Sequence, residues 1–191
     1  DISYAVMIED NNGCQFTSTV YLAQPPQIIY STTLSNHNGN GFQISCNGGS
    51  DGEITASATG GTGSFTYSID GINFQSSGAF SGLIEGAYTV TYQDATGCIE
   101  TDPVILTEPD VFTISYTVSN SIDCPGDCNG AVSITPSIGG VSPIWYSLDG
   151  GTQQTTPYFS GLCGAITNGS YSLDAIDDNG CIATDIVSIA E

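Results

Sequence analysis

Seven cysteines and a recurring acidic turn are the residues of this chain whose types and spacing could do chemistry. The cysteines stand at positions 14, 46, 98, 124, 128, 163 and 181. Three of them close the motif Asp-x-x-Gly-Cys, at residues 10–14, 94–98 and 177–181. Paired sulfurs form disulfides and four converging sulfurs hold zinc, whereas the recurring carboxylates could bind calcium or cap their own turns.

The spacing of this motif predicts tandem copies of one folding unit. Its cysteines follow one another at intervals of 84 and 83 residues, and such a period is the signature of a repeat array. Paired glycines at 60–61 and 139–140 also stand at equivalent places. We therefore expect residues 1–25 to be the C-terminal part of a preceding copy whose beginning is absent, and 27–108 and 110–191 to be two full copies.

Every apolar segment alternates with a period of two, which predicts half-buried antiparallel strands. Ile54, Ala56 and Ala58 share one face, and no window shows helical spacing. Short strands separated by clusters of Gly, Asn, Asp and Ser are typical of sandwiches and barrels. Asp70-Gly71 and Asp149-Gly150 predict tight hairpin turns. We expect an all-β chain of tandem, disulfide-stapled, immunoglobulin-like antiparallel sandwiches with seven strands per copy.

The cysteines are expected to be disulfides, because a sandwich of this size buries a small core. The first full copy holds only Cys46 and Cys98, which predicts their pairing. Equivalence then predicts Cys124–Cys181, and two further cysteines gained together predict Cys128–Cys163. Cys14 would pair within the absent part of the preceding copy. A zinc site of Cys124, Cys128, Cys163 and Cys181 is the alternative, but it explains nothing in the first copy.

The composition excludes several functions. The chain has no lysine or arginine, 20 acidic residues and a formal charge of −20. Nothing could neutralise nucleic-acid phosphates or anionic lipid, so neither is an expected partner. No segment is long and apolar enough for a membrane helix, so direct membrane insertion is not expected. Oxidised cysteines and this acidity instead favour a protein outside the cell.

The recurring carboxylates allow two interpretations. Asp10, Asp94 and Asp177 are expected to cap their own turns, with calcium ligation as the alternative. The other calcium candidates are Asp51, Glu53, Glu108 and Asp110. The earlier junction, residues 24–27, carries no acid, which argues against a general junctional calcium site. No cofactor is therefore expected, with calcium kept open.

The remaining candidates for an active or ligand site are two aromatic side chains, His37 and Trp145, and the acidic residues. His37 lies in a polar insertion at 35–41 and is expected to be solvated. Trp145 could contact a ligand such as a sugar, although a packed position is the expectation. The acids lie scattered in turns, and a nucleophilic serine would have no histidine partner other than His37. We therefore expect no enzymatic activity.

Seven motifs follow one another in a distinctive order: residues 46–52, Gly60–Gly63, Phe65–Tyr67, Ser81–Leu83, Gly86–Val90, Asp94–Cys98 and Thr107–Pro109. Taken in this order, they resemble the SprB repeat of Bacteroidetes surface proteins. The resemblance covers essentially the whole chain, with residues 1–25 as a partial copy. It implies a giant, repetitive cell-surface adhesin linked to gliding motility and exported by type IX secretion, with no catalytic residues.

These observations predict a structural stalk segment of an extracellular adhesin or filament. Its expected partners are neighbouring repeats of the same long chain, and a surface polysaccharide or protein. The alternatives are a glycan- or protein-binding module and a calcium-stiffened spacer.

Overall fold

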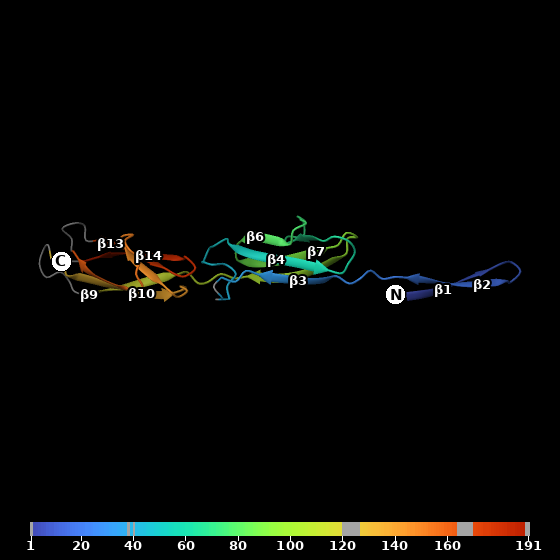
Figure 1. Ribbon diagram of the computed structural model, residues 1–191, viewed down its shortest axis with the longest axis horizontal. Helices are drawn as coiled ribbons and strands as arrows, with labels where there is room; N and C mark the ends of the chain where they lie inside the picture. Colours follow the sequence, from blue (N-terminus) through green and yellow to red (C-terminus); the bar gives the residue numbers. More distant parts are fainter. Residues whose placement is uncertain (1, 38, 40, 120–126, 164–169, 190–191) are drawn as a thin grey trace. The chain divides into compact units, whose positions relative to one another are not determined.

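A computed structural model describes residues 2–37, 39, 41–119, 127–163 and 170–189 (Figure 1). These residues contain fourteen β-strands and no helix, and all the strand pairs with a recorded register are antiparallel. The prediction of an all-β, antiparallel, disulfide-containing chain is therefore confirmed. No described helix could cross a lipid bilayer.

The chain divides into two compact units that do not follow the sequence copies. Unit 1 comprises residues 1–32, 56–78 and 89–102. Unit 2 comprises residues 33–55, 79–88 and 103–191. Several strands of the first full copy therefore begin in one unit and end in the other.

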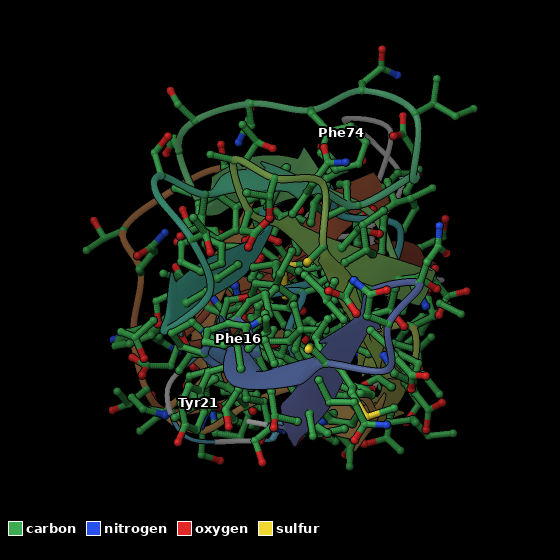
Figure 2. All side chains as sticks on the ribbon, turned by 90° about the vertical axis from the view of Figure 1, so that its right-hand side faces the viewer. Phe16, Tyr21 and Phe74 are labelled. Carbon is green, nitrogen blue, oxygen red and sulfur yellow. A yellow bond between two sulfur atoms is a disulfide. The ribbon has the colours of Figure 1, made fainter. Side chains whose placement is uncertain are left out.

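An isolated hairpin opens the chain. Strand β1 (Ile2–Glu9) pairs with β2 (Gln15–Leu22) over their whole length, from Ile2 opposite Leu22 to Glu9 opposite Gln15. Every residue of both strands is exposed. Phe16 and Tyr21 of β2 are 67% and 75% exposed (Figure 2).

The first full copy contains two three-stranded sheets. Their orders are β3-β4-β6 and β5-β7-β8. Strand β4 shows the predicted alternation, since Ile54 is fully buried and Ala56 nearly so, whereas Glu53, Thr55 and Ser57 are exposed. The strands are β3 (Ile29–Leu34), β4 (Gly52–Thr59), β5 (Thr66–Ser68), β6 (Ala79–Leu83), β7 (Gly86–Gln93) and β8 (Ile99–Leu106).

The second full copy repeats this arrangement with sheets β12-β10-β9 and β11-β13-β14. One buried cluster draws on both sheets: Val132 and Ile134 come from the first, and Leu173 and Val187 from the second. Two sheets joined by such a cluster make a sandwich. The strands are β9 (Thr113–Ser119), β10 (Gly130–Ile138), β11 (Trp145–Leu148), β12 (Tyr158–Leu162), β13 (Ser170–Ile176) and β14 (Ile182–Ser188).

Each copy has six described strands, one fewer than the seven predicted from the sequence. After β5 the chain turns back and forms a single β-bridge with that strand, between Tyr67 and Gln75. The equivalent β-bridge to β11 joins Tyr146 and Gln154. The intervening turn explains the short contact, because four hydrogen bonds hold the Asp70 carboxylate to Ser68, Ile72 and Asn73. The predicted turn at Asp70-Gly71 is thus present, with Gly71 at a φ of 72°, but it leads into one bridge rather than a strand.

Candidate functional site: a disulfide between two copies

Each Asp-x-x-Gly-Cys segment forms the same tight turn, named here the Gly-Cys turn. In the turn at 177–181, Asp177 Oδ1 accepts N–H bonds from Asn179 at 3.0 Å and from Cys181 at 2.8 Å. Its other oxygen, Oδ2, accepts the N–H of Val141 at 2.9 Å. Asp177 is only 2% exposed. One carboxylate therefore shapes the turn and also ties it to the loop that follows β10.

The turn at 94–98 has the same geometry. Asp94 Oδ1 accepts the N–H groups of Thr96 and Cys98, both at 2.9 Å, and Oδ2 accepts the N–H of Thr62 at 2.9 Å. Burial of this carboxylate raises its pKa, but hydrogen bonds from the Thr96 hydroxyl and from the N–H groups of Cys98, Thr62 and Thr96 outweigh that effect, so the pKa of Asp94 lies below its usual value. The carboxylate is therefore held as an anion by backbone donors.

The disulfide Cys46–Cys181 joins the first full copy to the second. Its Cα atoms lie 5.5 Å apart, and the two cysteines are separated by 135 residues. Asn179 Nδ2 also donates to the carbonyl of Ser45 at 3.2 Å. The Gly-Cys turn of the second copy thus holds Cys46 by one covalent bond and by a hydrogen bond beside it.

Residues 43–52, named here the cysteine loop, present Cys46 in a self-supporting conformation. Asp51 Oδ1 accepts the N–H of Ser45 at 3.0 Å, and Gly49 donates to the carbonyl of Cys46 at 2.9 Å. Gly49 has no room for a side chain, because an added Cβ would lie 2.8 Å from Ile44 Cγ2 and 2.9 Å from the carbonyl of Cys46. The loop therefore carries much of its own shape.

The segment between the copies is held to the same loop. Glu108 Oε1 accepts from Asn47 Nδ2 at 2.7 Å, and Oε2 accepts the N–H of Gly48 at 2.7 Å. Asn47 Nδ2 also donates to the carbonyl of Pro109 at 3.0 Å. The cysteine loop thus fastens both the start of the linker and, through Cys46, the second copy.

The expected pairings Cys46–Cys98 and Cys124–Cys181 are wrong, because Cys46 bonds to Cys181 and Cys98 is a free, exposed thiol. Strand β8 gives the physical reason. Cys98 directly precedes β8, whereas Cys46 lies beside Glu108, just beyond its end. Eight extended residues span about 26 Å, and bridged Cα atoms must lie within about 7 Å. A bridge inside the first copy would need to cross that length.

The remaining cysteine predictions have separate outcomes. Cys128–Cys163 is a disulfide, as predicted from their joint presence in the second copy. Cys14 is a free, exposed thiol in the described hairpin. Cys124 lies outside the described residues. The four-sulfur zinc alternative is wrong, since Cys128 and Cys163 are bonded to each other and Cys181 is bonded to Cys46.

A shallow hollow of about 260 Å³ flanks the disulfide between the copies. The residues that line it are Cys46, Asn47, Val111, Phe112, Gly180, Cys181 and Ile182. Cys181 itself is 7% exposed. The bonded sulfur is therefore shielded on one side by Phe112 and the turn.

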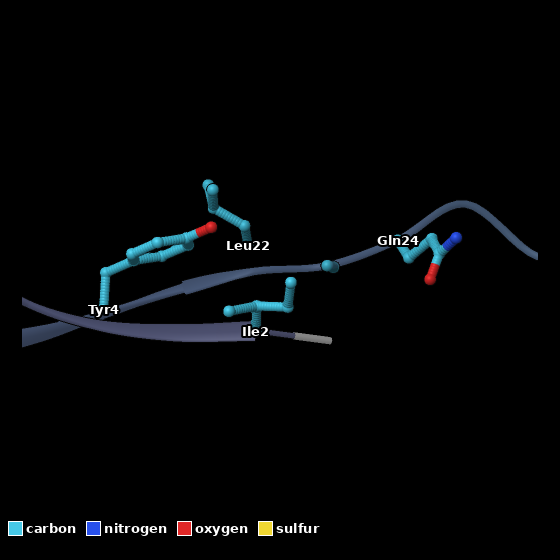
Figure 3. A pocket seen from close by; sticks show the side chains of 5 residues that line it. Ile2, Tyr4, Leu22 and Gln24 are labelled. Carbon is cyan, nitrogen blue, oxygen red and sulfur yellow. The ribbon is translucent and has the colours of Figure 1, made fainter.

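A second hollow, of about 270 Å³, lies on the open face of the first hairpin (Figure 3). Ile2, Tyr4 and Leu22 line it together with Ala23 and Gln24. By sequence, Leu22 corresponds to Leu106 of the first full copy. Leu22 is 57% exposed and Leu106 is 1% exposed. The hairpin thus exposes to solvent a face whose counterpart in the first full copy is buried.

The calcium candidates do not gather in the described part of the chain. Asp94 and Asp177 accept backbone N–H groups, Glu108 binds the cysteine loop, and Asp110 is exposed. Asp51 holds Ser45, and Glu53 is an exposed residue of β4. Among the described residues, no three acidic, histidine or cysteine side chains are arranged to hold a metal.

Of the two other candidate side chains, Trp145 lies on a strand of the second copy, whereas His37 lies beside the cysteine loop. Trp145 begins β11 opposite Ile176 and is half-buried. His37 is also partly buried rather than fully solvated, and its Nε2 lies 3.6 Å from Asp51 Oδ2. The expectation that His37 is fully solvated is therefore wrong, because its side chain is partly buried.

The polar residues that seat the disulfide have no distinctive sequence pattern. Ser45, Asn47 and Asn179 are common turn residues, and only their contacts show their role: within the cysteine loop for Ser45, to the linker for Asn47, and between the copies for Asn179. The Asn47–Glu108 contact spans 61 residues. Sequence proximity offered no signal for it.

The comparison with curated proteins finds no match. The family comparison does find one, in the segment that holds Cys46, the paired glycines and the Asp70-Gly71 turn. The SprB repeat is a family of structural repeats associated with cell-surface proteins. Residues 43–74 match the family model of the SprB repeat, so the resemblance drawn from the sequence motifs is confirmed in that segment.

Proposed function

We propose that this chain is a covalently linked stalk segment of a large, secreted cell-surface adhesin or filament. The observation that carries the proposal is the disulfide Cys46–Cys181, which joins two successive copies. A bridge inside one copy stabilises that copy alone, whereas a bridge between copies also limits how far the chain can be drawn out. Resistance to extension is the property that a stalk requires.

The match to the SprB repeat supports a place at the cell surface. Disulfides persist in oxidising surroundings outside the cytoplasm, which agrees with secretion. A role in surface attachment or gliding motility, and export by type IX secretion, are part of the proposal through this family. The binding tip of such an adhesin would lie elsewhere, with these copies setting its reach.

The exposed first hairpin supports a tandem arrangement. Val6 and Ile8 of β1 correspond by sequence to Val90 and Tyr92 of β7, and they are 43% and 65% exposed where the latter are fully buried. In the full copies, the equivalent hairpin pairs with a further strand, β5 or β11. Residues 1–25 thus match the closing hairpin of a copy and leave exposed the face that the other strands of a full copy cover.

Single-molecule pulling on the oxidised and reduced chain tests this function. The bridge excludes 135 residues from extension, so full reduction should lengthen the unfolded chain by about 470 Å at about 3.5 Å per residue. Cys181→Ser keeps Cys128–Cys163, which spans 35 residues. That variant should therefore gain only about 350 Å.

Cys98→Ser is the matched control, because it removes an exposed thiol and leaves both bridges. Its unfolded length should equal that of the unaltered oxidised chain. Equal lengths for the oxidised and reduced chains would refute a load-limiting bridge between copies.

A further inference from the structure

The two Gly-Cys turns of the full copies have the same structure and differ in the state of their sulfur. Asp94 and Asp177 each accept two N–H bonds within the turn and one from the glycine-containing loop, all between 2.8 and 3.0 Å. Cys181 is bonded and 7% exposed, whereas Cys98 is free and exposed. The cysteine of this turn is therefore disulfide-bonded in the second copy and a free thiol in the first.

The apolar residues on the two glycine loops that donate to these carboxylates also correspond, and each is named here the wall of its turn. Phe112 packs over Gly140, where an added Cβ would lie 2.5 Å from its ring, and Ile28 occupies the same place over Gly61, at 3.2 Å. These two residues are 8% and 7% exposed. Ile182 follows Cys181 and Ile99 follows Cys98, and both are more than half exposed. The Gly-Cys turn at 94–98 thus has Ile28 at its glycine loop, in the place that Phe112 takes at the loop of the turn at 177–181.

Cys14 provides an internal contrast. Its turn keeps the local bonds, since Asp10 Oδ1 accepts the N–H groups of Asn12 and Cys14, both at 2.9 Å. Among the described residues, only groups of the turn itself donate to the Asp10 carboxylate, and the two flanking strands are exposed throughout. Cys14 therefore shares the turn and the exposure of Cys98 without its wall.

We propose that Cys98 is the acceptor site for a second disulfide between copies, made with the Cys46-type cysteine in the cysteine loop of a further copy of the repeat. The inference rests on the proposed function only in taking tandem copies as the source of that loop. The filled site at Cys181 is the direct precedent. Each bridge would then tie the cysteine loop of one copy to the Gly-Cys turn of the next.

The chemistry is an ordinary thiol–disulfide exchange. Two thiols lose two protons and two electrons to a disulfide oxidant, which is reduced to its dithiol form. In stepwise form, the Cys98 thiolate attacks the partner sulfur of a mixed disulfide. The new S–S bond forms as the leaving thiolate departs with the electron pair of the old bond and takes up a proton.

A peptide probe of residues 43–53 tests the proposal, with its cysteine activated as a mixed disulfide with 2-thiopyridine. This segment keeps Ser45 and Asp51, which shape the loop. The full chain would carry Cys14→Ser and Cys124→Ser, so that Cys98 is the thiol left outside the two bridges. Release of pyridine-2-thione gives the rate, and mass spectrometry after cleavage at acidic residues locates the adduct.

A peptide with the same residues in reversed order is the matched control for charge and reactivity. We expect the native-order peptide to react with Cys98 at least about tenfold faster than the reversed one, because only the native order fits the wall and the turn. A Cys98→Ser, Cys124→Ser chain keeps Cys14 and should react with both peptides at about the same rate.

Equal rates of the two peptides at Cys98 would overturn the proposal and leave Cys98 as an exposed thiol. Equal discrimination at Cys14 would also overturn it, because the wall would then play no part. The pulling experiment depends only on Cys46–Cys181. It can succeed where peptide exchange fails, so the two proposals are separable.

Discussion

Single carboxylates organise the Gly-Cys turns, and the sequence allowed this role to be predicted beside the calcium alternative. The recurrence of Asp four residues before Cys is a local pattern, and capping of a turn by its own first residue is a local interaction. The bonds from Thr62 and Val141 are not local, and the sequence offered no sign of them.

Asp177→Ala should destabilise the second copy by about 2–3 kcal/mol, because three N–H groups lose their acceptor in a buried position. Urea unfolding measures the loss, and amide exchange at Val141 and Cys181 should accelerate. Asp10→Ala is the matched control in the exposed hairpin and should change global stability little. Equal losses for both variants would contradict the importance of the long-range bond.

Acid should destabilise the chain partly through Asp94. Its pKa in the folded state lies below the value of about 3.9 expected for an unfolded aspartate. The unfolded state then binds the proton more readily, so the stabilisation is fully present above about pH 4 and is lost as the pH falls through the folded pKa.

Asp94→Asn removes this titrating group and should flatten the decline in the urea midpoint between about pH 5 and pH 3. Asp110→Asn is the control, since Asp110 is exposed and its side chain accepts no hydrogen bond from the described residues. Identical pH profiles for Asp94→Asn and the unaltered chain would refute this contribution.

At the scale of elements, periodicity predicted the strands well, because alternation reports directly which face is buried. In the described part of each copy it overcounted the strands by one. Tyr67 and Tyr146 each make a single bridge with the returning chain, and a bridge of one residue has no periodicity to detect. Paired glycines were recognised as repeat markers, but their packing role emerged only from the backbone contacts.

Gly60→Ala should be strongly destabilising. Gly60 has a φ of 76°, and an added Cβ would lie 2.0 Å from the carbonyl oxygen of Gln27. We expect a loss of about 3 kcal/mol, as for other forced backbone shifts. Thermal unfolding would show it as a clear fall in Tm.

Gly71→Ala separates steric from conformational cost. Gly71 has a similar φ of 72°, but nothing lies within 4 Å of an added Cβ. Its substitution should cost only about 1 kcal/mol. Similar losses at the two positions would mean that backbone strain, rather than the contact with Gln27, sets the requirement for glycine.

At the scale of the whole molecule, charge shapes the conditions under which the chain is stable. With a formal charge of −20 and no lysine or arginine, its carboxylates repel one another. Salt screens that repulsion, and the Debye length falls from about 10 Å at 0.1 M to about 3 Å at 1 M. We expect Tm to rise as NaCl is added over this range.

The same measurement tests the calcium-stiffened spacer. Calcium chloride and sodium chloride at matched ionic strength should raise Tm equally if screening alone acts. A larger rise with calcium, reversed by EDTA, would instead reveal specific ligation by carboxylates and carbonyls.

The sequence by itself determined the copy length, the strand class, the acidic turn and the extra bridge Cys128–Cys163. Each of these depends on local pattern or on a difference between copies. Only the tertiary structure decided the partner of Cys46. In a tandem array, a bridge within one copy and a bridge to the next copy join cysteines at the same two positions of the repeat. The repeat pattern therefore cannot distinguish the two pairings. The length of β8 separates them, because it sets the cysteine loop and the Gly-Cys turn of one copy a whole strand apart.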